Sequence, residues 1–538
     1  MTLYVVEEFT SEEEDVLRRY FTNLDEPVFA LVNLPEVVKG ALFARYSRSS
    51  KSLRRLFLDE FVGELDIEGD ESIDATIGLE RAEELYEKVF FEYGDDSVAQ
   101  LGGVHLACEQ ASNVLTKILE WGRLASYLEQ STRYIPYDRR LGGRYRYFRD
   151  PEILNSGHGT RFVGDLDRLF DTYADLIPKV QDHIRLVSPK SANDSDFIYR
   201  TAVQAKALDA VRGILPSAAQ SNVGIYGSGQ SYEQLLIRMR SHPLPEAQAY
   251  ADLMLEELRK VIPSFVKRVD IDDRGGATSA YLERNHRSME KLAPELLGED
   301  TEADTEARVE LVDFDPEAEI KMVTAMLYPY TTMSERAIDN KVRAMSDGER
   351  IAVVEAYCGD RANRRHRPGR ALERPFYRFD VLADYGAFRD LQRHRMLTVE
   401  WQPLNPNHGF TRPELIDEAG LTGAFDEAME RSASLYGAIH NDFPAQAPYA
   451  VSLAYRVRFN MNLNARAAMH MLELRSTPQG HPAYRTVAQQ MHHAIEHVAG
   501  HKAIAAMMSF VNHASETDLE RLEAERRAES KRAELGLS

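Results

Sequence analysis

The stretch EWGRLASYLEQSTRY, residues 120–134, is the most informative part of the chain. It gathers hydroxyls, an amide, a carboxylate and a cation within nine residues: Ser126, Glu129, Gln130, Ser131, Arg133 and Tyr134. A phosphate or a pyrimidine edge needs such groups, because Arg presents a planar fork of N–H donors and Ser a small hydroxyl. A helix terminus with its cap is the competing interpretation, since the same residue types cap helices.

A second polar cluster, Gln392-Arg393-His394-Arg395, ends the amphipathic stretch 386–395. Two guanidiniums beside one imidazole repel each other unless a negative group compensates them. The cluster therefore predicts a phosphate-bearing ligand or an acidic partner. A surface salt-bridge cluster is the alternative.

The third cluster is MNLNARAAMHMLELRS, residues 461–476, which we expect to be helical. At 3.6 residues per turn, one face carries Asn462, Arg466, His470 and Glu473, and another carries Asn464, Met471 and Arg475. One face can pack while the other meets a ligand. An amphipathic core helix with a solvated polar side is the alternative.

These clusters also indicate an internal duplication. Residues 122–134 correspond in layout to 392–404, and IRMRS (237–241) corresponds to LELRS (472–476). Apolar periodicity predicts mainly helices over 10–130, including 37–47 and 81–94, and again over 161–211 and 230–269. Aromatics alternating with arginines predict a hairpin or ordered loop at 135–160.

The second half repeats this plan, with predicted helices at 317–328, 333–345 and 347–357 and a predicted strand at 373–385. The predicted organisation is a first half at 1–280, a linker at 281–310, a second half at 311–515 and a charged helical tail at 516–538.

The composition narrows the function. A formal charge of -21 argues against a general nucleic-acid-binding surface, because phosphate backbones bind to basic surfaces. The 2 cysteines are too few for a disulfide framework, so we expect a reducing cytoplasm. The acidic N-terminus and the lack of long apolar runs predict no membrane segment.

Here the chain resembles the flavin-dependent thymidylate synthases. Their signature is Arg-His-Arg, seven residues, Ser, then Arg two positions on. Arg123, Ser131 and Arg133 match its later part, and Arg393, His394 and Arg395 match its opening triplet. Each half departs from the rest of the signature at two positions, the first half at Trp121 and Gly122 and the second half at Pro403 and Asn405.

The resemblance continues downstream. NARAAMHMLELR supplies Asn464 and Arg475 at the family's spacing, with His470 in place of a second asparagine. Arg212 matches the arginine before the family's Leu-Pro turn, and Pro448 stands there in the second half. Gly102 and Arg374 occupy the place of a flavin-contacting histidine.

The resemblance implies an α+β fold, helix-rich overall, in which each half packs helices around a mainly antiparallel sheet. It implies FAD as cofactor, and dUMP, NADPH and methylenetetrahydrofolate as small-molecule partners. The expected flavin residues are Arg393, His394, Arg395, Asn464 and His470. The expected dUMP residues are Glu129, Gln130, Ser131, Arg133, Arg212 and Arg475, with Arg475 also polarising the base.

Two functional hypotheses remain open at this point. In one, the tandem chain forms a homodimer that is a pseudo-tetramer, and the first half's loop faces the helix bearing Arg475 across an interface. In the other, the protein is a degenerate, non-catalytic nucleotide-binding or assembly protein on the same fold.

Two further patterns carry alternatives. His493, His497 and His501 are spaced for one helical face and would suit zinc or nickel, although we predict no metal and expect a packed or solvated stripe. The segment Arg361–Arg378 is rich in arginine and fits an RNA or pyrophosphate site, with Phe376 and Tyr377 stacking a base, or a neutralising interface.

Overall fold

The computed structural model describes most of the chain from residue 102 onward and parts of the N-terminal region. The described residues are 7–25, 29, 31–36, 38–39, 42–43, 51–60, 62, 100, 102–192, 194–298, 304–514, 519, 522, 526–527 and 529–531. The predicted helix at 81–94, most of the one at 37–47 and most of the tail at 516–538 lie outside these ranges.

The chain forms two compact units that interleave in sequence. Unit 1 comprises Met1–Glu109, Gly122–Glu129 and Asn222–Glu299, and unit 2 comprises Gln110–Trp121, Gln130–Ser221 and Asp300–Ser538. The units therefore differ from the two predicted halves, since residues 130–221 of the first half pack with the second half in unit 2.

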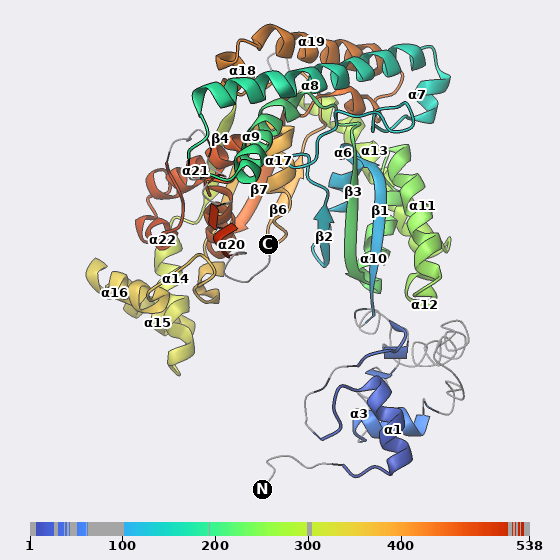
Figure 1. Cartoon of the computed structure of the whole chain (residues 1–538). Helices are drawn as coiled ribbons and strands as arrows, with labels where there is room; N and C mark the ends of the chain where they lie inside the picture. The colour runs from blue at the N-terminus through green and yellow to red at the C-terminus, as the bar shows by residue number, and fades with distance from the viewer. Residues whose placement is uncertain are drawn as a thin grey trace. The chain divides into compact units, whose positions relative to one another are not determined.

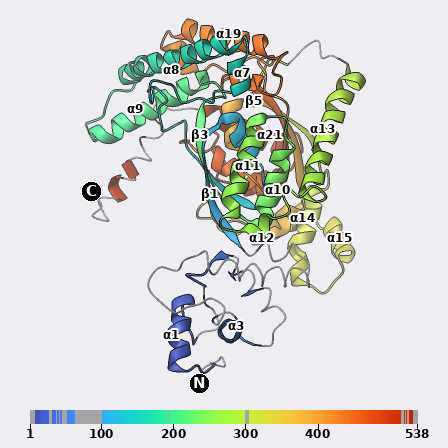
Figure 2. The same cartoon turned by 90° about the vertical axis from the view of Figure 1, so that its right-hand side faces the viewer.

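Unit 1 is built on a three-stranded sheet in the order β1-β3-β2, with β1 at Gly103–Ser112, β3 at Gln220–Ser228 and β2 at Ala125–Glu129. β2 and β3 are antiparallel. Val223 and Ile225 of β3 are buried and alternate with exposed positions, as expected for a strand with one covered face. Helices α10 and α11 lie in front of this sheet in Figure 2.

The remaining described helices of unit 1 are α1 (Ser11–Tyr20), α3 (Leu53–Glu60), α10 (Gly229–Arg240), α11 (Pro245–Arg259), α12 (Pro263–Val266) and α13 (Gly275–Leu297). Helix α13 occupies the first part of the predicted linker, which lacks strong apolar periodicity because α13 is exposed along most of its length.

Unit 2 contains a four-stranded antiparallel sheet in the order β4-β5-β7-β6. Its strands are β4 (Arg308–Phe314), β5 (Phe376–Asp384), β7 (Arg456–Asn464) and β6 (Thr398–Trp401). Tyr377, Phe379 and Val381 of β5 alternate into the core, which confirms the strand predicted at 373–385. The predicted fold class, helix-rich α+β with antiparallel sheets, is confirmed.

The helices that complete unit 2 have the following bounds: α6 (Asn113–Leu119), α7 (Pro151–Asn155), α8 (Gly159–Val187), α9 (Asp196–Val211), α14 (Ala318–Leu327), α15 (Glu335–Ala344), α16 (Asp347–Cys358), α17 (Tyr385–Leu391), α18 (Glu414–Glu418), α19 (Thr422–Ile439), α20 (Ala465–Arg475), α21 (Pro482–His497) and α22 (Lys502–Met507). Short 3₁₀ turns are η1 (Arg212–Ile214), η2 (Tyr328–Tyr330), η3 (Arg370–Glu373) and η4 (Ala447–Ala450). No helix among the described residues is both long and apolar enough to cross a bilayer.

The duplication is visible in the topology. The order β1–α6–β2, then β3–α10–α11, matches β5–α17–β6, then β7–α20–α21, and β3 lies between β1 and β2 as β7 lies between β5 and β6. Even the helix caps correspond: Ser112 and Asp384 cap α6 and α17, and Ser228 and Asn464 cap α10 and α20.

Two equivalent segments, 213–218 and 449–454, pair with each other inside unit 2. Each lies between a 3₁₀ turn and the strand that follows, and four backbone hydrogen bonds of 2.8–3.1 Å join them in antiparallel fashion. If the two segments are exchanged, the hydrogen bonds at one end of the pairing become those at the other end. An isologous dimer interface has the same symmetry. We call this pairing the seam.

The seam also positions α17. Gly386 N donates to Leu453 O at 3.1 Å, and Leu453 N donates to Leu215 O at 2.9 Å. Arg212, which directly precedes the seam, is therefore held beside the first turn of α17. A Cβ on Gly386 would stand 3.1 Å from the nearer Arg212 nitrogen, so glycine permits this approach.

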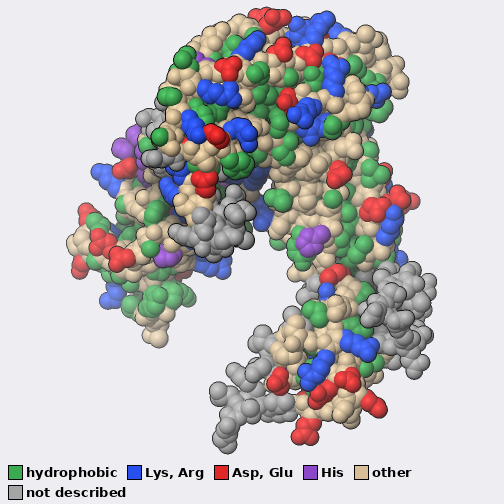
Figure 3. Space-filling view, in the orientation of Figure 1, with side chains coloured by type: hydrophobic (Ala, Val, Ile, Leu, Met, Phe, Trp, Pro, Cys, Tyr) green, Lys and Arg blue, Asp and Glu red, His purple; other side chains and the backbone are tan. Residues whose placement is uncertain are grey.

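Above the seam, α8 runs alongside α19 (Figure 1). The outer surface of this pair carries interspersed acidic and basic side chains (Figure 3). Arg161 and Arg431 both pair with Asp165. This is a solvated helical face, where such ion pairs contribute little to stability.

The structure corrects three local predictions. Residues 125–129 form strand β2 rather than the end of a helix. Asn462 lies in β7, because α20 begins only at Ala465, so Asn462 shares no helical face with Arg466. His501 lies beyond the end of α21 and is buried against Tyr377, so the three histidines form no single stripe. The turn predicted within 135–160 is confirmed, with Leu141 bridging to Arg144.

The seam predicts a specific stability effect at Ser432. Its hydroxyl accepts from Ser452 N at 2.9 Å and donates to Ala450 O at 2.8 Å, and the side chain is fully buried. Ser432→Ala leaves two buried backbone groups unsatisfied and should lower the free energy of unfolding by about 1–3 kcal/mol in urea denaturation. Ser434→Ala, on the exposed side of the same helix, removes only a solvent-exposed hydrogen bond from Arg161, and as the control it should change the free energy of unfolding by less than about 1 kcal/mol. Equal effects of the two changes would contradict a structural role for the seam.

Candidate functional site

Asp390, in the last turn of α17, is the centre of a buried cluster of arginines in unit 2. Its carboxylate oxygens lie 3.5 Å from Arg212 Nη1, 3.7 Å from Arg393 Nη1 and 3.7 Å from Arg475 Nη1. Burial alone would raise the pKa of Asp390, but Arg212, followed by Arg393 and Arg475, holds it well below its usual range. Asp390 is thus a carboxylate at any physiological pH.

Arg133 enters the cluster from the loop after β2. Its Nε and Nη2 atoms each donate to a different oxygen of Asp209 at 2.8 Å, and Nη2 also donates to Gln479 O at 3.1 Å. Nη1 donates to the hydroxyl of Tyr484 at 2.7 Å. Such a bidentate pair fixes the guanidinium plane.

Arg475, the last residue of α20, meets Arg133 through one aromatic ring. The guanidinium carbons of Arg133 and Arg475 lie 5.5 Å and 5.4 Å from the centroid of Tyr484. A cation over an aromatic ring is attracted by the ring's quadrupole. Arg133 of the first half and Arg475 of the second half therefore share one ring within a single chain, and no second chain is needed for this contact.

Arg475 also defines the state of His394. Its Nε donates to His394 Nε2 at 2.9 Å, so that nitrogen carries no proton and the ring is neutral. Burial and, next, the charge of Arg475 keep the pKa of His394 well below its usual value. The ring of His470 lies edge-on to His394, with centroids 5.4 Å apart.

Arg212 is the most enclosed of the four arginines, with a relative exposure of 4%. Burial lowers its pKa, and Asp390 counteracts the shift. Its Nη2 atom is buried and has no hydrogen-bond partner among the described residues. A buried guanidinium nitrogen without an acceptor is costly, so this atom is a strong indication of an anion site.

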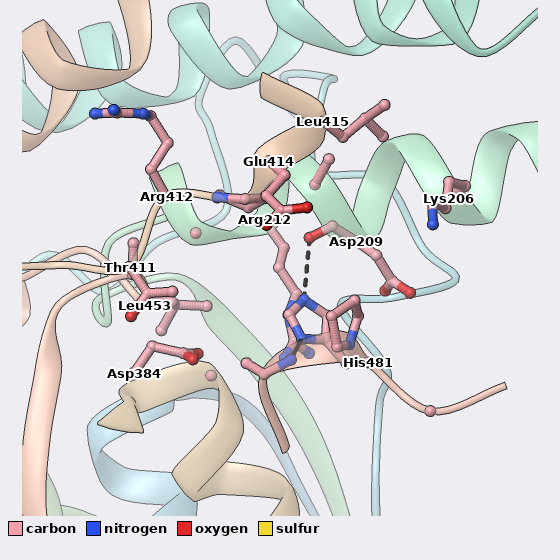
Figure 4. A pocket seen from close by; sticks show the side chains of 18 of the residues that line it. Lys206, Asp209, Arg212, Asp384, Thr411, Arg412, Glu414, Leu415, Leu453 and His481 are labelled. Carbon is pink, nitrogen blue, oxygen red and sulfur yellow. Dashed lines mark hydrogen bonds between the residues drawn. The ribbon is translucent and has the colours of Figure 1, made fainter. Parts of the chain in front are cut away.

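A pocket of about 560 Å³ opens beside Arg212. Figure 4 shows Arg212 beside the hydrogen-bonded pair of Asp209 and His481, with Asp384 on the other side of Arg212. His481 Nε2 lies 3.2 Å from Asp209 O, and its Nδ1 accepts from Ala483 N, so the ring is neutral. Burial raises the pKa of Asp384, and the neighbouring Arg212 opposes this shift.

Three enclosed guanidiniums of the cluster lie close together. Arg133, Arg212 and Arg475 contact Asp209 and Asp390, and Asp384 lies beside Arg212. The histidines beside them are neutral. A phosphate oxygen would supply the acceptor that Arg212 Nη2 lacks among the described residues.

Five other predicted residues lie in the loops, strand ends and helix cap near these elements. Ser131 Oγ accepts from Arg133 N at 3.2 Å, and Gln130 O accepts from Ser221 Oγ. Asn464 caps α20 by accepting from Ala467 N at 2.8 Å, and Arg395 lies half-buried in the loop after α17. Glu129 is buried at the end of β2 in unit 1, and its predicted role is a proposal.

The sequence interpretation missed Asp209, Asp390, Tyr484 and His481. A signal existed for the two aspartates, since each stands three residues before an arginine of the cluster, Arg212 or Arg393. Tyr484 carried no signal, because its ring acquires a role only when α21 packs beside α20.

The chain belongs to the thymidylate synthase complementing protein family, whose model matches residues 41–264 and 310–500. It is 39% identical to the UPF0159 protein of Chlamydia muridarum over 526 residues, covering 97% of this chain and 98% of that one. The UPF0159 protein Ta1429 of Thermoplasma acidophilum is 33% identical over 514 residues, covering 90% of this chain and 97% of that one.

A solved structure of the UMP/dUMP methylase PolB from Streptomyces cacaoi, bound with 5-Br dUMP, also aligns with this chain. The alignment has 18% identity and a TM-score of 0.30, and covers 39% of this chain and 100% of that one. A likeness at this level decides nothing about the site.

We expect a substitution of Asp390 to lower the free energy of unfolding strongly. Asp390→Asn removes the shared countercharge of three guanidiniums and should lower the free energy of unfolding by about 3–5 kcal/mol. Asp182→Asn, at an exposed pair with Arg185, is the control and should cost less than about 1 kcal/mol. Urea denaturation at pH 7 distinguishes them, and a small effect at Asp390 would mean that the arginines are compensated otherwise.

His481 predicts a pH effect of known sign. Burial, followed by the charge of Arg212, lowers the pKa of His481 to about 3. In the unfolded chain this histidine binds a proton at about pH 6.5, whereas in the folded chain it stays unprotonated until about pH 3. The free energy of unfolding therefore falls as the pH drops from about 6.5 towards 3. His481→Asn, which can keep both hydrogen bonds, should make this fall shallower. His286→Asn, at an exposed position, should leave the slope unchanged, and thermal unfolding at pH 7, 6, 5 and 4 measures both.

Proposed function

We propose that this chain is a flavin-dependent thymidylate synthase-like enzyme that converts dUMP to dTMP with FAD, NADPH and methylenetetrahydrofolate. The observation that carries the proposal is the buried Arg212 Nη2 atom, which lacks an acceptor among the described residues and lies in the cluster of arginines around Asp390. The phosphate of a nucleoside monophosphate would supply that acceptor. Membership of the thymidylate synthase complementing protein family supports uridine as the nucleoside.

In this proposal the phosphate of dUMP is held by Arg133, Arg212 and Ser131, with Gln130 in the same loop. Arg475 polarises the uracil ring as the catalytic residue. It is suited to this task because Tyr484 and His394 fix its guanidinium on two sides. Polarising a carbonyl requires a donor that is already oriented, since reorganisation during the reaction would cost rate.

The residues around the Arg393–Arg395 triplet fit a flavin nucleotide by their donor chemistry. Arg393 and Arg395 offer guanidiniums for phosphate, and the neutral rings of His394 and His470 offer flat, uncharged surfaces. The oxygen of Asn464 is used as a helix cap, which leaves its amino group as a donor. Bound FAD would supply hydride transfer to the pyrimidine.

We further propose a homodimer in the cytoplasm. Leu128 and Tyr226 lie two register positions apart on β2 and β3 and are 81% and 47% exposed. Apolar side chains on an open sheet face are typical of an interface.

A non-catalytic nucleotide-binding or assembly protein is the second candidate. It is favoured by one observation, namely that Asp209 already occupies the two nitrogens of Arg133 that a phosphate would use. In that case the cluster is largely structural, and a nucleotide must displace a carboxylate in order to bind.

The decisive measurement is release of tritium from C5 of labelled dUMP by the purified protein with FAD, NADPH and methylenetetrahydrofolate. Arg133→Gln should raise the KM for dUMP about 100-fold, because a charged phosphate contact is lost. Arg140→Gln, at an exposed surface pair, is the control and should act like the unchanged protein. Flavin absorbance without tritium release would favour the second candidate. The absence of both flavin absorbance and tritium release would contradict the proposed enzyme.

A further inference from the structure

One face of α20 carries Arg466, His470 and Glu473, which are spaced at i, i+4 and i+7. His470 lies between the other two on this face, and its ring contacts His394 of the proposed flavin region. Whatever crosses this face is therefore adjacent to the nucleotide site.

The segment 361–368, here called the arginine arch, crosses it. At one end, Arg361 Nη1 and Nη2 donate to the two oxygens of Glu473 at 2.6 Å and 2.7 Å, and both side chains are almost fully buried. At the other end, Pro368 O accepts from Arg466 Nε at 3.2 Å. Because the arch is tied to α20 on both sides of His470, residues 362–367 must pass over His470.

The arch is closed upon itself as well. Arg361 Nε donates to His366 O at 2.6 Å, and Ala362 N donates to His366 Nδ1 at 3.3 Å. Arg361 therefore works as an anchor and is not available to a ligand. The backbone of this turn is held at both ends and across its middle. Binding a ligand to its remaining side chains therefore costs little further backbone conformational entropy.

The other arginines of this region fall into two groups. Downstream, each of three arginines faces a carboxylate: Arg370 pairs with Glu373, Arg374 with Glu335 and Arg378 with Asp313. On the arch, Arg364, Arg365 and Arg367 have no carboxylate within ion-pairing distance among the described residues. In a chain of net charge -21, three adjacent uncompensated guanidiniums indicate a reserved anion site.

We propose that the arginine arch binds the diphosphate of a dinucleotide whose other end reaches His470 and His394. Arg364 and Arg367 would hold the diphosphate from above α20, and Arg365 would add a third cation at its outer edge. The ligand's identity rests on the function proposed above, whereas the anion site itself rests on the arch alone.

Two observations favour a small diphosphate over RNA. Tyr377, which we expected to stack a base, is fully buried and bonded to His501, so it offers no platform. Single-stranded nucleic acid needs such aromatic platforms together with an extended basic track. In addition, Arg367 and Arg364 lie close enough to His470 to lower its pKa, after burial, to about 4, which agrees with an arch that overhangs this ring.

The test compares two double variants by calorimetric titration of the full chain with inorganic pyrophosphate. Arg364→Gln with Arg367→Gln should weaken pyrophosphate binding about tenfold to a hundredfold, because two charge-assisted contacts are lost. Arg370→Gln with Arg378→Gln removes the same net charge at paired positions and should change it less than about twofold. Circular dichroism should show both variants folded, since Arg361 and Glu473 are untouched.

Two competing titrations identify the source of the diphosphate. If FAD displaces pyrophosphate, the arch serves the flavin, and if NADPH does, it serves the reductant. Equal pyrophosphate affinity in the two double variants, or none in the unchanged protein, would overturn the proposal. Loss of RNA retention with unchanged pyrophosphate binding would overturn it too. Pyrophosphate binding at the arch without dUMP turnover would uphold the arch and contradict only the proposed enzyme.

Discussion

The backbone pairing of residues 213–218 with 449–454 is the constraint on which the rest of unit 2 depends. It joins the halves at equivalent segments and fixes the end of α9 against the start of α17. Arg212 and Asp390, more than 170 positions apart in sequence, are neighbours only because of this pairing. The buried serines beside it satisfy the backbone groups that two strands would otherwise leave open.

The cluster built on this pairing stabilises the fold and is also the proposed binding site. Asp390 and Asp209 reduce the repulsion among Arg133, Arg212 and Arg475 enough for these three guanidiniums to be enclosed together, while Arg393 stays partly exposed. Replacing either carboxylate by an apolar group would destabilise the fold. His394 and His481 are neutral first because they are buried, and second because a protonated ring beside Arg475 or Arg212 would be repelled.

The sequence predicted Arg133, Arg212 and Arg475 as site residues because their motifs are local, and the duplication because both halves repeat one layout. It could not predict that Tyr484 lies between two of these arginines, since that contact depends on how α21 packs. The errors at Asn462 and His501 share one cause. Helical spacing was extended past residues where the chain caps or ends a helix, and apolar periodicity alone does not mark that point. In the Arg361–Arg378 segment, composition indicated an anion site, but only the fold separates anchored and paired arginines from free ones.

Because both segments belong to one chain, the seam needs less binding free energy than the same contact between two separate subunits. Two separate subunits joined by such a contact come apart on dilution, whereas segments of one chain meet at an effective concentration set by the connecting polypeptide. The contact can therefore be small and still remain closed in dilute solution. Fusion also frees each copy to change alone. Arg212 and Pro448 occupy equivalent positions in the two copies, so one copy has the arginine and the other does not. In a symmetric assembly of identical subunits, one substitution would change every copy of this position.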